Sequence, residues 1–166
     1  RRANLPRAQY AEPLLGSLLW LLHGAGGNGK TTMLEVLQQV FLREGIGTIV
    51  FTAYTGVATT ALPKPAATFC TLLSVSGQDG AANHPRAYDH AKHGMRFESI
   101  AGNTDELVAM VVDEVSQIGT NNIQHLNART QNILGNSLLF GGLMVIAPGD
   151  VSLHARPAQT PTRLSF

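Results

Sequence analysis

Hydrophobic residues along the chain fall into two patterns, continuous short runs and runs with three- and four-residue spacing. Short apolar runs bounded by turn residues are typical of buried strands, whereas the longer spacing is typical of helices with one buried face. The continuous runs predict strands at 18–23, 48–53, 107–112 and 143–147. The spaced runs predict helices at 57–62, 68–74 and 118–134, and a short helix and turn within 4–17.

The clearest helix follows the first strand, where apolar residues recur at helical spacing until Gly45 and Gly47 end the pattern. Its apolar positions are Met33, Leu34, Leu37, Val40 and Phe41. Residues 76–96 carry Gly, Asn, His and Pro without a period and predict a long surface loop.

The order strand, helix, strand within about 35 residues predicts a βαβ unit, and such units build parallel sheets. The predicted fold class is therefore α/β, with a parallel sheet flanked by helices.

Between the first strand and its helix, residues 24–31 read GAGGNGKT and match G-x-x-x-x-G-K-[ST] at every fixed position. This is the phosphate-binding P-loop, in which glycines let backbone N–H groups point at an anion and the following helix adds its positive end. Lys30 would reach the β- and γ-phosphates, and the Thr31 hydroxyl would bind Mg²⁺. The predicted nucleotide-binding residues are Gly24, Gly26, Gly27, Asn28, Gly29, Lys30, Thr31 and Thr32. The alternative is a glycine-rich turn that binds nothing.

A P-loop also needs a carboxylate at the end of a neighbouring strand, and the run 107–112 ends in Asp113-Glu114. Asp113 is the candidate on the Mg²⁺ side, and Glu114 is the candidate that orients or deprotonates the attacking water. The other interpretation is an acidic cap on the following helix.

Composition narrows the class of protein. A chain of 166 residues with 44% hydrophobic and 14% charged residues suits one compact domain. Its apolar runs are far shorter than the roughly 20 residues of a membrane helix, so no membrane contact is expected. The only cysteine is Cys70, and no signal peptide is visible, which favours an intracellular protein. A net charge of +1 gives no global case for nucleic acid. The chain starts without Met, which suggests a fragment.

Several short motifs occur in a characteristic order. They read TAYTGVA at 52–58, TFCTLL at 68–73, VDEVSQI at 112–118, FGGL at 140–143 and GD at 149–150. This succession resembles the petite-integration-frequency DNA helicases of superfamily 1B, including their relatives in Helitron-type transposons. The resemblance runs from about Leu5 to Asp150.

The resemblance implies a RecA-like P-loop NTPase motor domain over 1–150, the first of two in a parent protein that hydrolyses ATP with Mg²⁺ and moves 5′ to 3′ on single-stranded DNA. It implies that Thr55, Gly56 and Thr68 approach the DNA backbone, and that a glutamine upstream of the P-loop reads adenine. Gln9 is the candidate for this glutamine, or else an ordinary surface residue. The resemblance further implies a nuclear or mitochondrial protein of DNA repair, recombination and telomere maintenance.

The chain also departs from the family pattern, with Tyr54 in place of Pro and Cys70 in place of His. Leu153 replaces the glutamine that senses the γ-phosphate, which puts the coupling between ATP state and DNA grip in question. Residues 151–166 form an irregular tail, either native or truncated or frame-shifted.

The second motor domain and its arginines are absent from this chain, so we expect nucleotide binding with poor hydrolysis. Two other classes stay open, a small-molecule P-loop kinase and a transposon remnant that binds nucleotide without turnover. The segment 84–96 is locally basic, and it either contacts phosphates beside the DNA path or forms a solvated loop.

Overall fold

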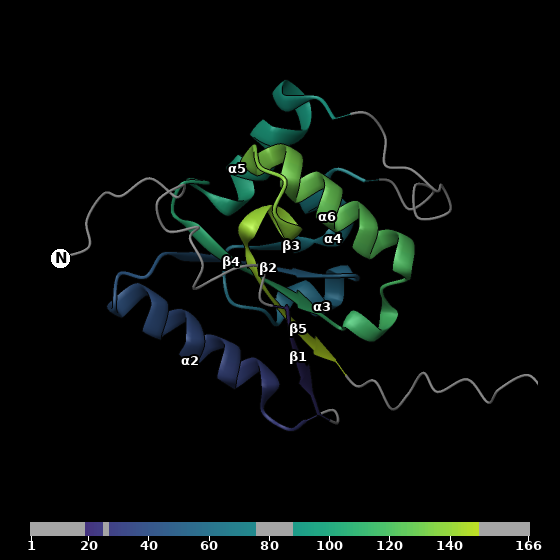
Figure 1. The fold of residues 1–166 in the computed structure, drawn as a ribbon. Coiled ribbons are helices and arrows are strands. Elements are labelled where there is room, and N and C mark those ends of the chain that lie inside the picture. The colour runs from purple at the N-terminus through teal and green to yellow at the C-terminus, as the bar shows by residue number, and fades with distance from the viewer. Residues whose placement is uncertain (1–18, 25–26, 76–87, 150–166) are drawn as a thin grey trace, which may run out of the picture.

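The computed structural model describes residues 19–24, 27–75 and 88–149. Its centre is a five-stranded parallel sheet with the strand order β1-β5-β4-β2-β3 (Figure 1). The strands are β1 (Leu19–His23), β2 (Thr48–Ala53), β3 (Ala66–Thr68), β4 (Leu107–Asp113) and β5 (Met144–Gly149). The parallel α/β architecture predicted from the sequence is confirmed.

Helices cover both faces of this sheet, with α2 on one face and α4 and α6 on the other (Figure 1). The α-helices are α2 (Lys30–Arg43), α3 (Gly56–Thr60), α4 (Phe69–Leu73), α5 (Met95–Ala101) and α6 (Thr120–Leu134). Shorter turns of other helical types are η2 (His90–Gly94), η3 (Val115–Gln117) and η4 (Leu139–Gly142). No described helix is both long and apolar enough to cross a membrane.

The alternation of side chains along β2 explains why two separate cores form. Ile49 and Phe51 point to the face where Leu34 and Phe41 of α2 pack, while Val50 points to the core under α4 and α6. Since successive residues of a strand face opposite sides, a strand buried on both faces must be apolar throughout. This is why β2 and β4 appear in the sequence as unbroken apolar runs.

The end of α2 is fixed by local backbone chemistry, as the glycine pattern predicts. The N–H of Ile46 donates to the carbonyl of Phe41 at 3.0 Å, and the N–H of Gly45 donates to the carbonyl of Leu42 at 3.3 Å. These two bonds form a Schellman motif, which satisfies carbonyls at a helix end. The helix therefore stops where the chain must turn toward β2.

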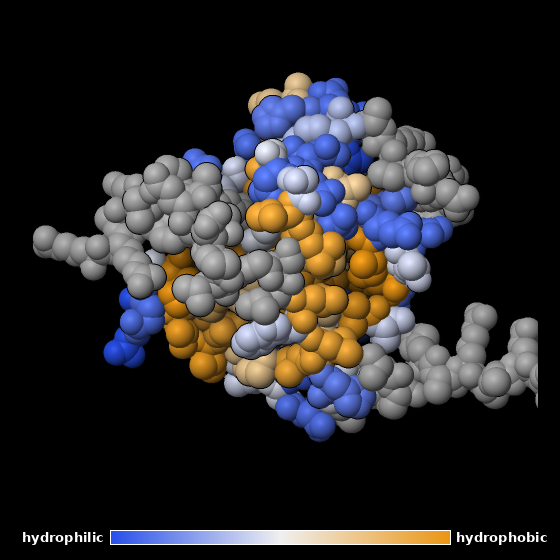
Figure 2. All heavy atoms as spheres, viewed as in Figure 1, coloured by the Kyte–Doolittle hydropathy of each residue, from blue (hydrophilic) through white to orange (hydrophobic). Residues whose placement is uncertain are grey.

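The prediction that the first strand is buried is wrong. β1 pairs only with β5 among the described strands and lies at the edge of the sheet. Leu19, Trp20 and Leu21 are 56%, 56% and 57% exposed. Figure 2 shows apolar atoms gathered over the region where β1 and β5 lie. Apolarity shows that a segment tends to be buried, but it does not say how many neighbours the fold supplies.

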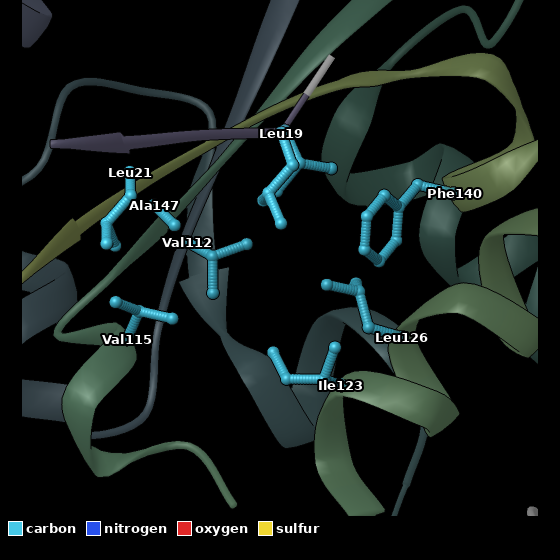
Figure 3. A pocket seen from close by; sticks show the side chains of 9 residues that line it. Leu19, Leu21, Val112, Val115, Ile123, Leu126, Phe140 and Ala147 are labelled. Atoms are coloured by element: carbon cyan, nitrogen blue, oxygen red, sulfur yellow. The ribbon is translucent and has the colours of Figure 1, made fainter. Parts of the chain in front are cut away.

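An apolar pocket of about 220 Å³ lies beneath β1 on the α6 side of the sheet. Figure 3 shows its side chains pointing toward a common space from β1, β4, β5, α6 and the two short helices η3 and η4. They are Leu19, Leu21, Val112, Val115, Ile123, Leu126, Phe140, Val145 and Ala147. The lining contains no polar residue, so this pocket lacks the groups that acid-base or phosphate chemistry requires.

The loop predicted for 76–96 is partly wrong, since 90–94 form η2 and α5 begins at Met95. The absence of an apolar period in so short a turn hid it from the pattern. The three-residue strand β3 was also missed, because it is too short to show alternation. The predictions for 4–17, 76–87, Gln9, Leu153 and the tail 151–166 lie outside the described residues.

The turn η2 is joined to α6 through His93. Its Nδ1 accepts hydrogen bonds from the N–H of Asp89 at 3.0 Å and from the buried Arg129 guanidinium at 3.2 Å. The guanidinium also lies over the ring of Tyr88, 5.6 Å from its centre. Burial, and then the charge of Arg129, hold the pKa of His93 below its ordinary value of 6.5. The neutral ring is therefore the form that this packing requires.

We expect His93→Gln to flatten the dependence of stability on pH. Because the pKa of His93 is lowered in the folded state, the unfolded chain binds the proton more readily, and this stabilisation is present above about pH 6.5 and lost as pH falls further. Glutamine offers an acceptor that does not titrate in this range. Urea unfolding from about pH 8 to about pH 5 measures the slope. His90→Gln, in the same turn, is the control, and identical slopes for both variants would contradict the prediction.

Candidate active site

The carboxyl ends of the parallel strands meet at one edge of the sheet, where ligands bind in open α/β folds. The P-loop leaves β1 at this edge, and Asp113 ends β4 there, with β5 between the two strands. Ala53 at the end of β2 is in register with Asp113 on one side and with Thr68 on the other. The fold thus brings the segments that carry all the described candidate residues to one edge.

The described part of the P-loop has the backbone shape that requires glycine. Gly27 and Gly29 have φ values of +79° and +74°, where a side chain would be strained, and a Cβ on either would meet nothing within 4 Å. The N–H of Gly24 donates to the carbonyl of Gly149 at 3.4 Å, which ties the start of the loop to the end of β5. Gly26 lies outside the described residues. The described loop is thus open in front of its glycines, as a loop that receives a phosphate must be.

The first turn of α2 follows directly from this loop. Lys30 is the first residue of the helix, Thr31 is half-buried, and Thr32 is exposed. The ammonium of Lys30 donates to the carbonyl of Gly24 at 2.6 Å, so its side chain folds back over the loop. The first N–H groups of a helix have no acceptor within it, and the helix dipole adds positive potential there. This turn therefore offers donors and a cation to an anion held by the loop.

Asp113 and Glu114 follow β4 on the facing side of the edge, and both are half-buried. The N–H of Glu114 donates to Oδ1 of Asp113 at 2.9 Å, and Glu114 has a φ of +54°, which turns its side chain away from the strand direction. Oε2 of Glu114 is buried and has no hydrogen-bond partner among the described residues. A buried carboxylate oxygen without a partner is costly, so a donor supplied by a ligand or by water fits here.

The alternative interpretation of Asp113-Glu114 as a helix cap is wrong. The side chain of Glu114 makes no cap bond to η3, and α6 begins only at Thr120 after Gly119. The acidic pair is therefore not explained by the helix that follows it.

The three residues expected near DNA lie at the same edge as the P-loop. Thr55 caps α3 by accepting from the N–H of Ala58 at 3.2 Å, and Gly56 begins that helix. Thr68 caps α4 by accepting from the N–H of Thr71 at 3.2 Å. Both hydroxyls are thus held in place by short helices, which fixes the backbone around them.

Thr68→Ala should lower the free energy of unfolding by about 1 kcal/mol, because the N–H of Thr71 loses its acceptor. Urea unfolding measures the change. Thr68→Ser keeps the hydroxyl and is the matched control, for which we expect a smaller loss. Equal losses for the two variants would show that the cap contributes nothing.

Comparisons with known proteins agree with this geometry. Residues 8–142 match the AAA domain family. No curated protein matches the chain. Three solved structures share its fold. Pif1 of Bacteroides sp. in complex with ADP-AlF4 is 19% identical with a TM-score of 0.62, covering 89% of this chain and 31% of that one. Pif1 from Bacteroides in complex with ADP-AlF3 and ssDNA is 17% identical with a TM-score of 0.57, covering 87% and 30%.

The third structure, Pif1 helicase from Candida albicans, is 21% identical with a TM-score of 0.53, covering 82% of this chain and 29% of that one. This chain therefore spans about a third of the length of the solved chains it matches. The family match covers most of the chain, and the parallel sheet and the glycine loop agree with it. The chain thus belongs to the AAA domain family, and its fold is the RecA-like P-loop NTPase fold found in part of Pif1 helicases.

Proposed function

We propose that this chain is the ATP-binding motor domain of an ATP-dependent DNA helicase. The observation that carries the proposal is the meeting of the P-loop, the first turn of α2 and the pair Asp113-Glu114 at one edge of a parallel sheet. A loop that binds phosphate and an acidic pair across from it are the two halves of a phosphoryl-transfer site.

Each half has a separate task in this proposal. The ammonium of Lys30 and the N–H groups of the loop and first turn hold the phosphates and stabilise the charge that develops during transfer. Lys30 exchanges its bond to the carbonyl of Gly24 for one to a phosphate oxygen. Such preorganised donors need little rearrangement when the reaction occurs.

Glu114 acts on the attacking water. Its unpartnered, buried oxygen Oε2 accepts a proton from water, while the bond between the N–H of Glu114 and Asp113 keeps the two carboxylates apart. Thr31 and Asp113 supply a hydroxyl and a carboxylate, the oxygen ligands that Mg²⁺ prefers. When bound, Mg²⁺ would neutralise charge on the β- and γ-phosphates.

The DNA partner is proposed from the edge geometry and the relatives. Thr55, Gly56 and Thr68 lie beside the nucleotide site, so movement of this edge can be coupled to ATP. One of the solved structures that share the fold is a Pif1 helicase in complex with ADP-AlF3 and ssDNA. Movement 5′ to 3′ and unwinding belong to a longer parent with a second motor domain, because translocation needs two domains that open and close.

Three finer points stay part of the proposal. Gln9 reads adenine, and the parent acts in the nucleus or mitochondrion in DNA repair, recombination and telomere maintenance. These points are supported only by the motif order described above.

Titration of ATP into the folded chain, followed by calorimetry, tests the proposal. We expect heat of binding that depends on magnesium, and its absence would overturn the nucleotide site. In the longer parent, single-stranded DNA should raise the rate of ATP hydrolysis.

A second candidate function is a transposon remnant that binds nucleotide without turnover. The observation that favours it is Leu153, which stands where the resemblance expects the glutamine that senses the γ-phosphate. Equal hydrolysis with and without DNA in the longer parent would favour this candidate or the kinase.

A further inference from the structure

The connection between β2 and α3 places two exposed side chains of low polarity at the edge that carries the candidate site. Tyr54 is 39% exposed and Val57 is 83% exposed, whereas Thr52 and Ala53 immediately before them are fully buried. Tyr54 comes one residue after Ala53, which is in register with Asp113 of β4 and Thr68 of β3. An exposed aromatic ring is therefore held between the acidic pair and the Thr68 cap.

The backbone under these side chains is fixed by hydrogen bonds. Thr55 caps the helix, the Thr59 hydroxyl donates to the carbonyl of Gly56 at 2.7 Å, and the Thr60 hydroxyl donates to the carbonyl of Val57 at 2.7 Å. The ammonium of Lys64 donates to the carbonyl of Thr59 at 3.2 Å and so holds the other end. A ligand that docks here loses little binding energy to ordering of the protein.

The chemistry of the segment points to nucleobases rather than phosphates. Residues 54–60 contain no acidic or basic side chain, so this surface lacks the cations that phosphate contacts use. A phenol ring offers a flat face, and every base has a π-face that can stack on it without regard to sequence. A motor that moves along DNA needs contacts of this sequence-tolerant kind.

We infer that Tyr54, with Val57 beside it in the chain, forms a stacking platform for a base of single-stranded DNA. This inference rests on the proposed function, since it assigns a base contact to the DNA path. It adds a determinant that distinguishes a strand with bases from a bare sugar-phosphate chain.

The experiment compares two ligands of equal charge on the full chain. Fluorescence anisotropy measures the affinity for a short oligothymidylate and for an abasic oligonucleotide with the same number of phosphates. We expect the oligothymidylate to bind about 5- to 150-fold more tightly, which is the worth of stacking one base. Tyr54→Ala should remove this preference, and Tyr54→Phe should keep it.

Two further variants separate stacking from folding. Leu42→Ala truncates an equally accessible apolar side chain near the end of α2, toward the opposite edge of the sheet, and should keep the preference. Tyr54→Leu keeps apolar bulk without a π-face and should lose the preference even if Tyr54→Ala fails to fold, as thermal melting would show.

The possible results are distinct. Persistence of the preference in Tyr54→Leu, or equal binding of both oligonucleotides by the unaltered chain, overturns the stacking platform while DNA binding stands. Failure of the unaltered chain to bind either oligonucleotide overturns the proposed DNA path and the platform with it.

Discussion

Glu114→Gln is expected to lower the rate of ATP hydrolysis by about 100- to 10,000-fold, the usual contribution of a general base. The reason is local. Oε2 of Glu114 is buried and has no hydrogen-bond partner among the described residues, so a water held there would be its proton donor. An amide has nearly the same shape but cannot take up the proton. The rate is best measured in the longer parent with a second motor domain, with single-stranded DNA present.

The same substitution should leave the affinity for Mg-ATP nearly unchanged, because the phosphates are held by the P-loop. Glu106→Gln, which alters an exposed carboxylate next to the amino end of β4, is the matched control and should hydrolyse ATP at the normal rate. A normal rate in Glu114→Gln would remove Glu114 from the reaction. A loss of binding without a loss of rate would assign it to the nucleotide pocket instead.

Lys30→Ala should weaken binding of Mg-ATP by about 10- to 150-fold, the range expected when a hydrogen bond to a charged group is lost. Lys30 begins α2 and lies folded over the loop, 2.6 Å from the carbonyl of Gly24. It is thus positioned to meet a phosphate without a long search. Calorimetry with the full chain gives the affinity directly.

Lys92→Ala provides the comparison, since it removes an exposed cation from η2, away from the P-loop in the chain. Its affinity for Mg-ATP should match that of the unaltered chain. If both lysine variants weaken binding equally, the effect is one of overall charge and the P-loop has no special role. If neither does, Lys30 does not contact the nucleotide.

The two acidic residues show how far sequence reasoning could go at the site. An apolar run ending in Asp-Glu, together with a P-loop, predicts a carboxylate near the phosphates, and the parallel sheet brings the two segments to one edge. The sequence did not predict that Glu114 adopts a φ of +54°. That conformation depends on how the chain must turn into η3, which is a property of the packed structure.

The short strand β3 illustrates a different limit. Three residues give no alternation, so nothing in the sequence marks Ala66–Thr68 as a strand. Its pairing with β2 nevertheless decides that Thr68 lies beside Ala53 and close to Tyr54. Contacts between residues far apart in the sequence place these side chains together, and a local pattern carries no record of them.

By itself, the sequence determined the P-loop, the end of α2 and the parallel βαβ core, because glycine conformation, helix capping and side-chain alternation act over a few neighbouring residues. Only the tertiary structure decided that the apolar strand β1 lies at an edge and that Arg129 is buried against His93. Burial depends on how many distant elements pack around a residue. That number is set by the whole fold, since the free energy of packing is shared among all its parts.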